Sequence, residues 1–211
     1  MGLREEKKER TRRHIADTAW ALIADQGFAR VTVAEIARTA QVAEATVFNY
    51  FATKEDLFFF RLDELGERLV QGVLDRPTGE SVTAAYRRML LAQGGLVRQL
   101  DGDPQALDRL RTVNRVVAES PALQGREQIS LTRTAERLAA GLGGESGGAA
   151  TELLTARVVA HALVAVQRAL VMQVREAVLA DEIPEGLAER MARSTDEAFA
   201  LLERGFGGYG A

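Results

Sequence analysis

Cysteine and histidine, which carry much of the catalytic and metal chemistry in proteins, are scarce in this chain of 211 residues. It has no cysteine, which excludes disulfides, thiol catalysis, zinc–thiolate sites and iron–sulfur clusters. Its two histidines, His14 and His161, are 147 positions apart, and no Asp or Ser lies three or four residues from His161. These residue types and spacings predict no catalytic site, no metal site and no cofactor, so we do not expect an enzyme.

The segment 32–51, TVAEIARTAQVAEATVFNYF, has a pattern that suits binding instead. Thr32 can cap a short helix, and Glu35, three residues later, completes a capping box. The small Ala37 lets a second short helix approach the first, and Val47 anchors that second helix. An exposed short helix of this kind can enter the major groove of DNA. The residues left facing outward are Glu44, Ala45, Thr46, Phe48 and Asn49.

The elements that must position this segment are helical throughout. Apolar residues recur with a helical period, and strand patterns are lacking, so the sequence predicts an all-α fold of about nine helices. Proline and capping residues mark helix starts, whereas glycine marks breaks, including a loop at 141–148 and a loose tail at 205–211. The expected helices are Glu5–Gln26, Val33–Thr39, Glu44–Tyr50, Lys54–Leu74, Glu80–Leu100, Pro104–Glu119, Pro121–Ala140, Ala149–Ala180 and Glu185–Arg204.

Charge is distributed unevenly along the chain. The formal net charge is −3, which excludes a uniformly basic nucleic-acid binder but not a local basic surface. Residues 1–13 carry six Lys+Arg and three Glu, whereas residues 62–211 carry 17 Lys+Arg and 21 Asp+Glu. The longest apolar run, 158–166, is too short to span a bilayer and contains His161. We therefore expect a cytoplasmic protein that does not enter a membrane.

Residues 14–58 together resemble the TetR family of transcriptional regulators. A long first helix ends in Gly27-Phe28, and the helix-turn-helix residues Thr32-Val33-x-x-Ile36-Ala37, Ala40-x-Val42 and Thr46-Val47-Phe48-x-Tyr50-Phe51 follow. Lys54-Glu55-x-Leu57-Phe58 then opens the next helix. The resemblance implies a DNA-binding domain at 1–53 and an effector-binding and dimerisation domain at 54–204, connected by the helix from Lys54. It also implies a homodimer that binds a double-stranded, near-palindromic operator, most simply a repressor released by a small, largely apolar effector.

The family pattern also implies which residues contact DNA. Thr46, Phe48 and Asn49 would face bases and sugar–phosphate, while Lys54, at a helix start capped by Thr53, would hold a phosphate. The complete set is Arg12, Arg13, Thr32, Glu44, Ala45, Thr46, Phe48, Asn49, Tyr50 and Lys54.

Three positions depart from that pattern. Gln41 replaces the usual turn glycine and would be strained at a positive φ. Ala43 replaces a capping Ser or Thr, at a cost of roughly 1 kcal/mol. Phe48 replaces a tyrosine, so its phenolic hydrogen bond to phosphate is absent, and Tyr50 could supply a hydroxyl instead.

In the C-terminal part, the resemblance implies an effector pocket between the middle helices and a dimer interface made by the last two. The pocket candidates are Tyr86, Met89, Leu90, Leu107, Leu110, Asn114, Val117, His161, Val164 and Met172. The interface candidates are Leu163, Val166, Leu170, Leu187, Met191, Ala198 and Leu202.

Simpler interpretations stay open beside these. His161 can be a hydrogen-bonded core histidine, Asn114 can be a boundary residue of an amphipathic helix, and Phe58–Phe60 can be ordinary core. For the whole chain, two alternatives are an all-α enzyme whose helix-turn-helix is only a packing element and a helical adaptor with no role on DNA.

Overall fold

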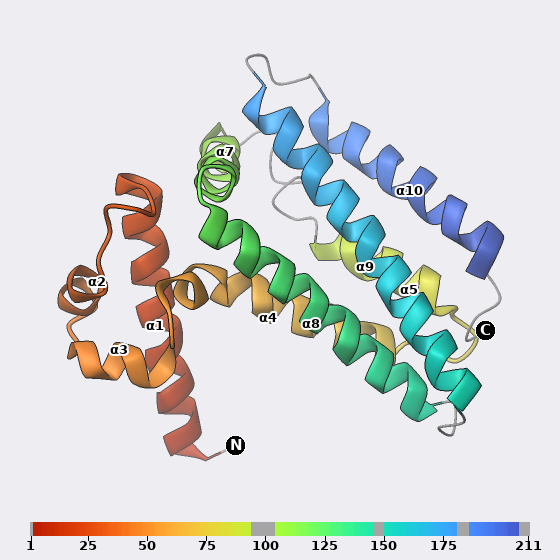
Figure 1. The fold of residues 1–211 in the computed structure, drawn as a ribbon, viewed down its shortest axis with the longest axis horizontal. Helices are drawn as coiled ribbons and strands as arrows, with labels where there is room; N and C mark the ends of the chain where they lie inside the picture. Colours follow the sequence, from red (N-terminus) through yellow and green to blue (C-terminus); the bar gives the residue numbers. More distant parts are fainter. Residues whose placement is uncertain (1, 94–103, 146–149, 181–185, 207–211) are drawn as a thin grey trace. The chain divides into compact units, whose positions relative to one another are not determined.

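The computed structural model describes residues 2–93, 104–145, 150–180 and 186–206. Within these ranges the chain is helical and contains no strand, which confirms the expected all-α class. The helices, labelled as in Figure 1, are α1 (Leu3–Gln26), α2 (Val33–Thr39), α3 (Glu44–Tyr50), α4 (Lys54–Leu74), α5 (Val82–Gln93), α7 (Pro104–Ala118), α8 (Pro121–Glu145), α9 (Ala150–Leu179) and α10 (Leu187–Phe206).

Helix α8 does not stop at the glycines that were expected to form a loop. It continues through Gly141 and Gly143 to Glu145. A Cβ atom added at Gly141 would lie 2.5 Å from the side chain of Leu74, and one added at Gly143 would lie 2.7 Å from that of Leu153. These glycines therefore permit close packing of α8 against neighbouring side chains, and the sequence alone made them look like helix breakers.

The other helix ends differ less from the expectation. Helix α5 begins at Val82 and extends to Gln93, and residues 94–100 of the expected helix 80–100 lie outside the described residues. Helix α10 runs through Gly205 to Phe206, so the expected loose tail is wrong at its first two positions, and the rest of it also lies outside the described residues.

The chain divides into two compact units. Unit 1 consists of residues 1–63 and 115–127, and unit 2 consists of residues 64–114 and 128–211. The expected boundary at 53/54 is therefore displaced into α4. The physical reason is that Leu57 and Phe58–Phe60, the start of α4, are buried and belong with the core of unit 1.

The core of unit 1 forms where α1 meets the short helices. On α1 the buried positions Ile15, Ala19 and Ile23 recur every four residues and so form one helical stripe. Ile36 of α2 and Val47 of α3 are also buried, and Val47 anchors the second short helix as the sequence predicted. The rings of Phe28 and Phe58 meet edge to face at 6.1 Å, and those of Phe51 and Phe60 do so at 5.6 Å. Phe58–Phe60 are thus core residues.

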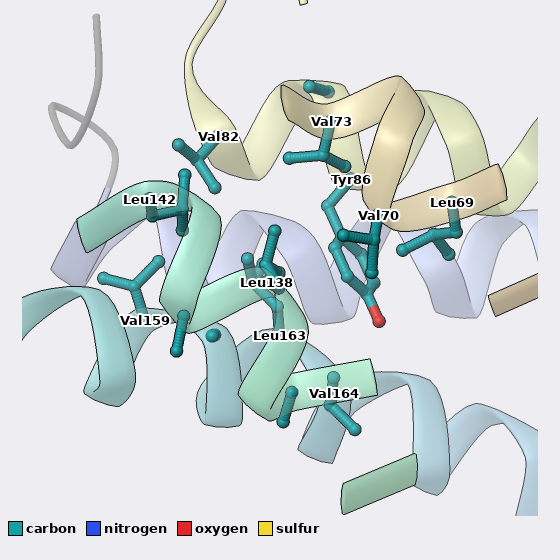
Figure 2. Close-up of a cluster of buried hydrophobic side chains, with 14 of the residues drawn as sticks. Leu69, Val70, Val73, Val82, Tyr86, Leu138, Leu142, Val159, Leu163 and Val164 are labelled. Carbon is teal, nitrogen blue, oxygen red and sulfur yellow. The ribbon is translucent and has the colours of Figure 1, made fainter. Parts of the chain in front are cut away.

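The core of unit 2 gathers side chains from five helices. Figure 2 shows Leu69, Val70 and Val73 of α4 close to Tyr86 of α5, with Leu138 of α8 and Leu163 of α9 beside them. Phe199 of α10 completes this cluster. Helices α9 and α10 pack side by side along their lengths (Figure 1). A smaller cluster contains Leu110, Val178, Leu187 and Met191.

Helix α9 is more apolar than its longest unbroken run suggested. It contains an 18-residue window of mean hydropathy 1.4, so by length and composition alone it could cross a membrane, although only 28% of that window is buried. A single helix of this kind is weak evidence for a membrane span, because core helices of soluble proteins pass the same test.

Candidate nucleic-acid interface

Thr32 begins the helix-turn-helix as the N-cap of α2. Its hydroxyl accepts a hydrogen bond from the backbone N–H of Glu35 at 3.1 Å, as expected. The reciprocal half of the capping box differs, since the Glu35 carboxylate accepts from Gln26 at 3.2 Å. Glu35 therefore connects α2 to the end of α1. His14 makes a second such connection, with its Nε2 atom 3.2 Å from the carbonyl oxygen of Ala40.

The turn between α2 and α3 has a positive φ at Gln41, the conformation in which the sequence predicted strain. Gln41 has a φ of +57°, the only positive value among the described non-glycine residues. The turn is closed by a hydrogen bond from Val42 N–H to the Ala37 carbonyl at 2.9 Å. Ala43 occupies the N-cap of α3 and provides no side-chain cap. Both departures from the family pattern thus fall where they cost stability.

Helix α3 presents one face outward. Val47 is buried, and Thr46 and Tyr50 are half-buried. The exposed positions are Glu44, Ala45, Phe48 and Asn49, and Phe48 is 55% exposed. The structure therefore brings together the predicted recognition residues on a single helical surface, with Thr46 and Tyr50 at its margin.

Lys54, which was expected to hold a phosphate, makes contacts within the protein. Its Nζ donates hydrogen bonds to the carbonyl oxygens of Phe28 at 2.8 Å and Val31 at 3.0 Å. The same ammonium group lies over the Phe28 ring, 4.1 Å from its centroid. Lys54 therefore connects the start of α4 to the segment between α1 and α2, a structural role that the sequence did not reveal.

The two arginines expected near DNA are also engaged. The Arg12 guanidinium lies over the rings of Phe60, at 4.7 Å, and Phe51, at 5.5 Å. Arg13 forms an exposed ion pair with Glu9, one helical turn away, at 3.1 Å. Such surface pairs contribute little to stability, so Arg13 can exchange Glu9 for another anion.

Sequence reasoning missed an ion-pair network between α4 and α8, in which Arg126 is buried and the two carboxylates are partly exposed. Arg126 of α8 donates to Asp56 at 2.7 Å and to Asp63 at 2.5 Å, and both carboxylates belong to α4. Thr53 also donates to Asp56, at 2.9 Å. Burial raises the pKa of Asp56, but the hydrogen bonds from Arg126 and Thr53 outweigh burial and leave that pKa below its usual value. No local pattern signals a contact between residues 70 positions apart.

The predicted effector residues do not form one group. Tyr86, Met89, Leu90 and Val164 belong to the main core of unit 2, and the Tyr86 hydroxyl donates to Gln167. Burial raises the pKa of Tyr86 far above its usual range.

A second part of the set lies at the smaller cluster. Leu107 and Leu110 belong to it. Asn114 is buried, and it donates to the Leu110 carbonyl and accepts from Arg175 at 3.3 Å.

Three of the effector candidates need correction. Val117 is buried but belongs to unit 1. His161 and Met172 are exposed on α9, and His161 lies 3.2 Å from Glu136 of α8. His161 is therefore neither a core histidine nor a lining residue of an internal cavity. The buried residues of α9 are Ala156, Val159, Ala160, Leu163, Val164 and Val178, and neither His161 nor Met172 is among them.

The predicted dimer residues need the same correction. Leu163 is 1% exposed, and Leu187 and Met191 are also buried, so these side chains are not available to a partner. Val166, Leu170 and Leu202 are half-buried against the main core, and Ala198 is half-buried on α10. The exposed large apolar residues of the described parts of these helices are instead Leu153, Leu154, Val158, Met172 and Leu201. Because α9 is apolar on most sides, its sequence could not show which apolar side faces inward.

Comparison with known proteins places this geometry in a family. A family model described as bacterial regulatory proteins, tetR family, matches residues 15–59. The chain is 32% identical to the transcriptional regulator TcmR of Streptomyces glaucescens over 124 residues, which is 58% of this chain and 54% of TcmR. It thus spans about half the length of that relative. It is 31% identical over 153 residues, 70% of this chain and 72% of the relative, to MftR of Mycobacterium tuberculosis, named as a mycofactocin biosynthesis transcriptional regulator.

Solved structures show the same fold. The SmeT–triclosan complex superposes with a TM-score of 0.56 at 16% identity and covers 93% of this chain and 91% of that one. SmeT is the repressor of a Stenotrophomonas maltophilia multidrug efflux pump. The match to MftR covers more than two thirds of that regulator, and the family model coincides with the helix-turn-helix described above. The chain therefore belongs to the tetR family of bacterial regulatory proteins, which are DNA-binding transcriptional regulators and not enzymes.

Proposed function

We propose that this regulator is a cytoplasmic homodimeric repressor that binds a near-palindromic operator and is released by a small, largely apolar effector. The observation that carries the proposal is the outward face of α3, where Ala45, Phe48 and Asn49 are exposed while Val47 anchors the helix. A short helix supported in this way can enter the major groove.

Other residues of unit 1 would fix the position of α3 on the duplex. Lysine has three donors, and the hydrogen bonds to Phe28 and Val31 use two of those on Lys54, so one donor is left for a phosphate oxygen. Arg12, Arg13, Thr32 and Tyr50 are the further candidates for backbone contacts. Such contacts set register and carry no sequence information of their own.

The proposed dimer surface is the exposed apolar side of α9 with the adjoining part of α10. Leu154 of α9 and Leu201 of α10 are each 62% exposed, and Val158 and Met172 of α9 are each 47% exposed. Apolar side chains grouped on an unpartnered surface favour an interface, and a two-fold axis is the commonest way to form one. A symmetric dimer matches half-sites about 34–36 Å apart, one turn of the DNA helix.

The proposed effector site lies in unit 2, where the remaining pocket candidates are found. Support comes from Asn114, a buried amide that meets Arg175 among the apolar residues Leu107 and Leu110. A few polar groups within an apolar lining are typical of small-molecule sites. The related fold of SmeT was solved with triclosan. For release, the effector must bind the DNA-incompetent conformation more tightly than the competent one.

An operator selection tests the proposal. The full chain would be incubated with randomised duplex DNA, and the bound sequences would be enriched and sequenced. The mass of the complex between the chain and the selected duplex would then be measured. We expect a near-palindrome that binds two chains per duplex. Enrichment of no sequence, or a single half-site that binds one chain, would contradict the proposed operator binding.

The effector is tested separately by mass spectrometry of small molecules that co-purify with the protein. A compound found in this way should release the selected operator from the wild type. Asn114→Leu should need a higher concentration of the compound for release, whereas Ile129→Ala, an exposed change on α8, should not. Release of the operator from both variants at the same concentration of the compound would contradict an effector site at Asn114.

A further inference from the structure

The recognition helix α3 lacks the side chains that most often read guanine. Arg and Lys, which pair with guanine O6 and N7 through two hydrogen bonds, provide the commonest specific contact in the major groove. Between Thr39 and Thr53 the only charged residue is Glu44. The exposed groups of α3 are thus one carboxylate, one amide, a methyl group and an aromatic ring.

The cationic groups near α3 do not replace the missing ones. Lys54 is directed to two backbone carbonyls, and the Arg12 guanidinium covers two phenylalanine rings. Arg38 stands at the last turn of α2, the helix that crosses the DNA backbone in helix-turn-helix proteins. None of these three cationic groups lies on α3, so base reading is left to the uncharged groups of α3 and to Glu44.

Phe48 is the most informative of the exposed groups. It is 55% exposed and is the only aromatic residue among the exposed large hydrophobic side chains that the structure describes. Its ring has no hydroxyl with which to bind a phosphate. Ala45 and Asn49 lie three residues before and one residue after it, so the three side chains share one face of the helix.

We propose that α3 reads A·T base pairs, with Phe48 and Ala45 packed against thymine 5-methyl groups and Asn49 hydrogen-bonded to adenine. Ala and Phe are suited to the thymine methyl, and the Asn amide matches adenine N6 and N7. The inference rests on the proposed function, because it requires α3 to enter the major groove. It adds the class of sequence recognised: half-sites whose α3-contacted positions are A·T pairs.

Replacing thymine by deoxyuridine in the selected operator tests this reading, since the change removes only the 5-methyl group. Each contacted thymine that is replaced should weaken binding about fourfold, the effect of losing one buried methyl group. Phe48→Ala should bind the thymine operator more weakly and should discriminate less between thymine and uracil than the wild type does. Replacement of thymines outside the half-sites is the control on the DNA.

Two results would overturn the inference while leaving operator binding intact. One is an operator in which uracil replaces every half-site thymine without loss of affinity. The other is a selected half-site whose α3-protected positions are G·C pairs, read by Glu44 through cytosine N4. Failure to select any sequence would instead overturn the proposed function together with this inference. Phe48→Leu keeps an apolar side chain at this position. It is the control that distinguishes loss of the contact with the thymine methyl group from loss of folding.

Discussion

The ammonium group of Lys54 hydrogen-bonds two backbone carbonyls between α1 and α2, and this position determines what its removal should do. Lys54→Met deletes both hydrogen bonds that the ammonium group donates to the carbonyl oxygens of Phe28 and Val31, and it deletes the contact of the ammonium with the Phe28 ring. We expect a loss of about 1–3 kcal/mol in the free energy of unfolding, measured by urea denaturation.

The matched control is Lys8→Met on the exposed part of α1, which should leave the free energy of unfolding unchanged. If Lys54→Met had the stability of the wild type and only weakened DNA binding, the structural role of Lys54 would be wrong.

Gln41 is a second residue whose backbone predicts the effect of a substitution. At a φ of +57° a residue with a Cβ atom is strained, whereas glycine is not. Gln41→Gly should therefore raise the free energy of unfolding by about 0.5–1 kcal/mol, after allowance for the greater freedom of glycine in the unfolded chain. Gln41→Ala keeps the Cβ atom and should give no gain. A Gln41→Gly variant with a lower free energy of unfolding than the wild type would contradict backbone strain at Gln41.

Among the elements, the ion pairs between α4 and α8 give unit 1 a pH dependence. Because the folded-state pKa of Asp56 is lowered, its contribution to stability is complete above the pKa of an unfolded Asp, about 4. That contribution is lost as the pH falls from about 4 through the folded-state pKa. We expect the free energy of unfolding of the wild type to fall in this range.

The side chain of Asp56→Asn cannot titrate. The free energy of unfolding of this variant should therefore fall less than that of the wild type between pH 7 and pH 3, as measured by urea denaturation. Asp25→Asn, an exposed change on α1, is the control and should follow the wild type. A variant Asp56→Asn with the same acid profile as the wild type would exclude a stabilising role for the network.

The elements also show what sequence could predict. Strong local signals gave the type of every described helix, and the capping residue Thr32 and the anchor Val47 lie as expected. Contacts distant in sequence escaped prediction: the Arg126 network, the carbonyl contacts of Lys54 and the packing of Gly141 against Leu74. The outward residues of α3 were predictable because a short helix that buries one side must expose the other. The pocket and interface residues were not, since α9 has apolar residues on several sides.

For the whole molecule, the exposed apolar side of α9 predicts an effect on assembly. The double variant Leu154→Asp/Val158→Asp places charges on that side, where a partner would have to bury them. Dimerisation should weaken at least about tenfold, which corresponds to 1.4 kcal/mol, in sedimentation equilibrium.

Operator affinity should fall with dimerisation, because a monomer engages one half-site only. Ile129→Asp, an exposed apolar position on α8, is the control and should remain dimeric. A dimeric double variant would place the interface elsewhere.

The central claim is that the outward face of α3 reads the operator, and the affinity of Asn49→Ala for the selected operator tests it most directly. Wild type and variant would be titrated against that operator and against copies carrying each base substitution in turn, at fixed salt. The variant should lose about 1–3 kcal/mol of binding free energy and should tolerate substitutions at one position of each half-site. Unchanged affinity and unchanged base preference in Asn49→Ala would contradict the claim.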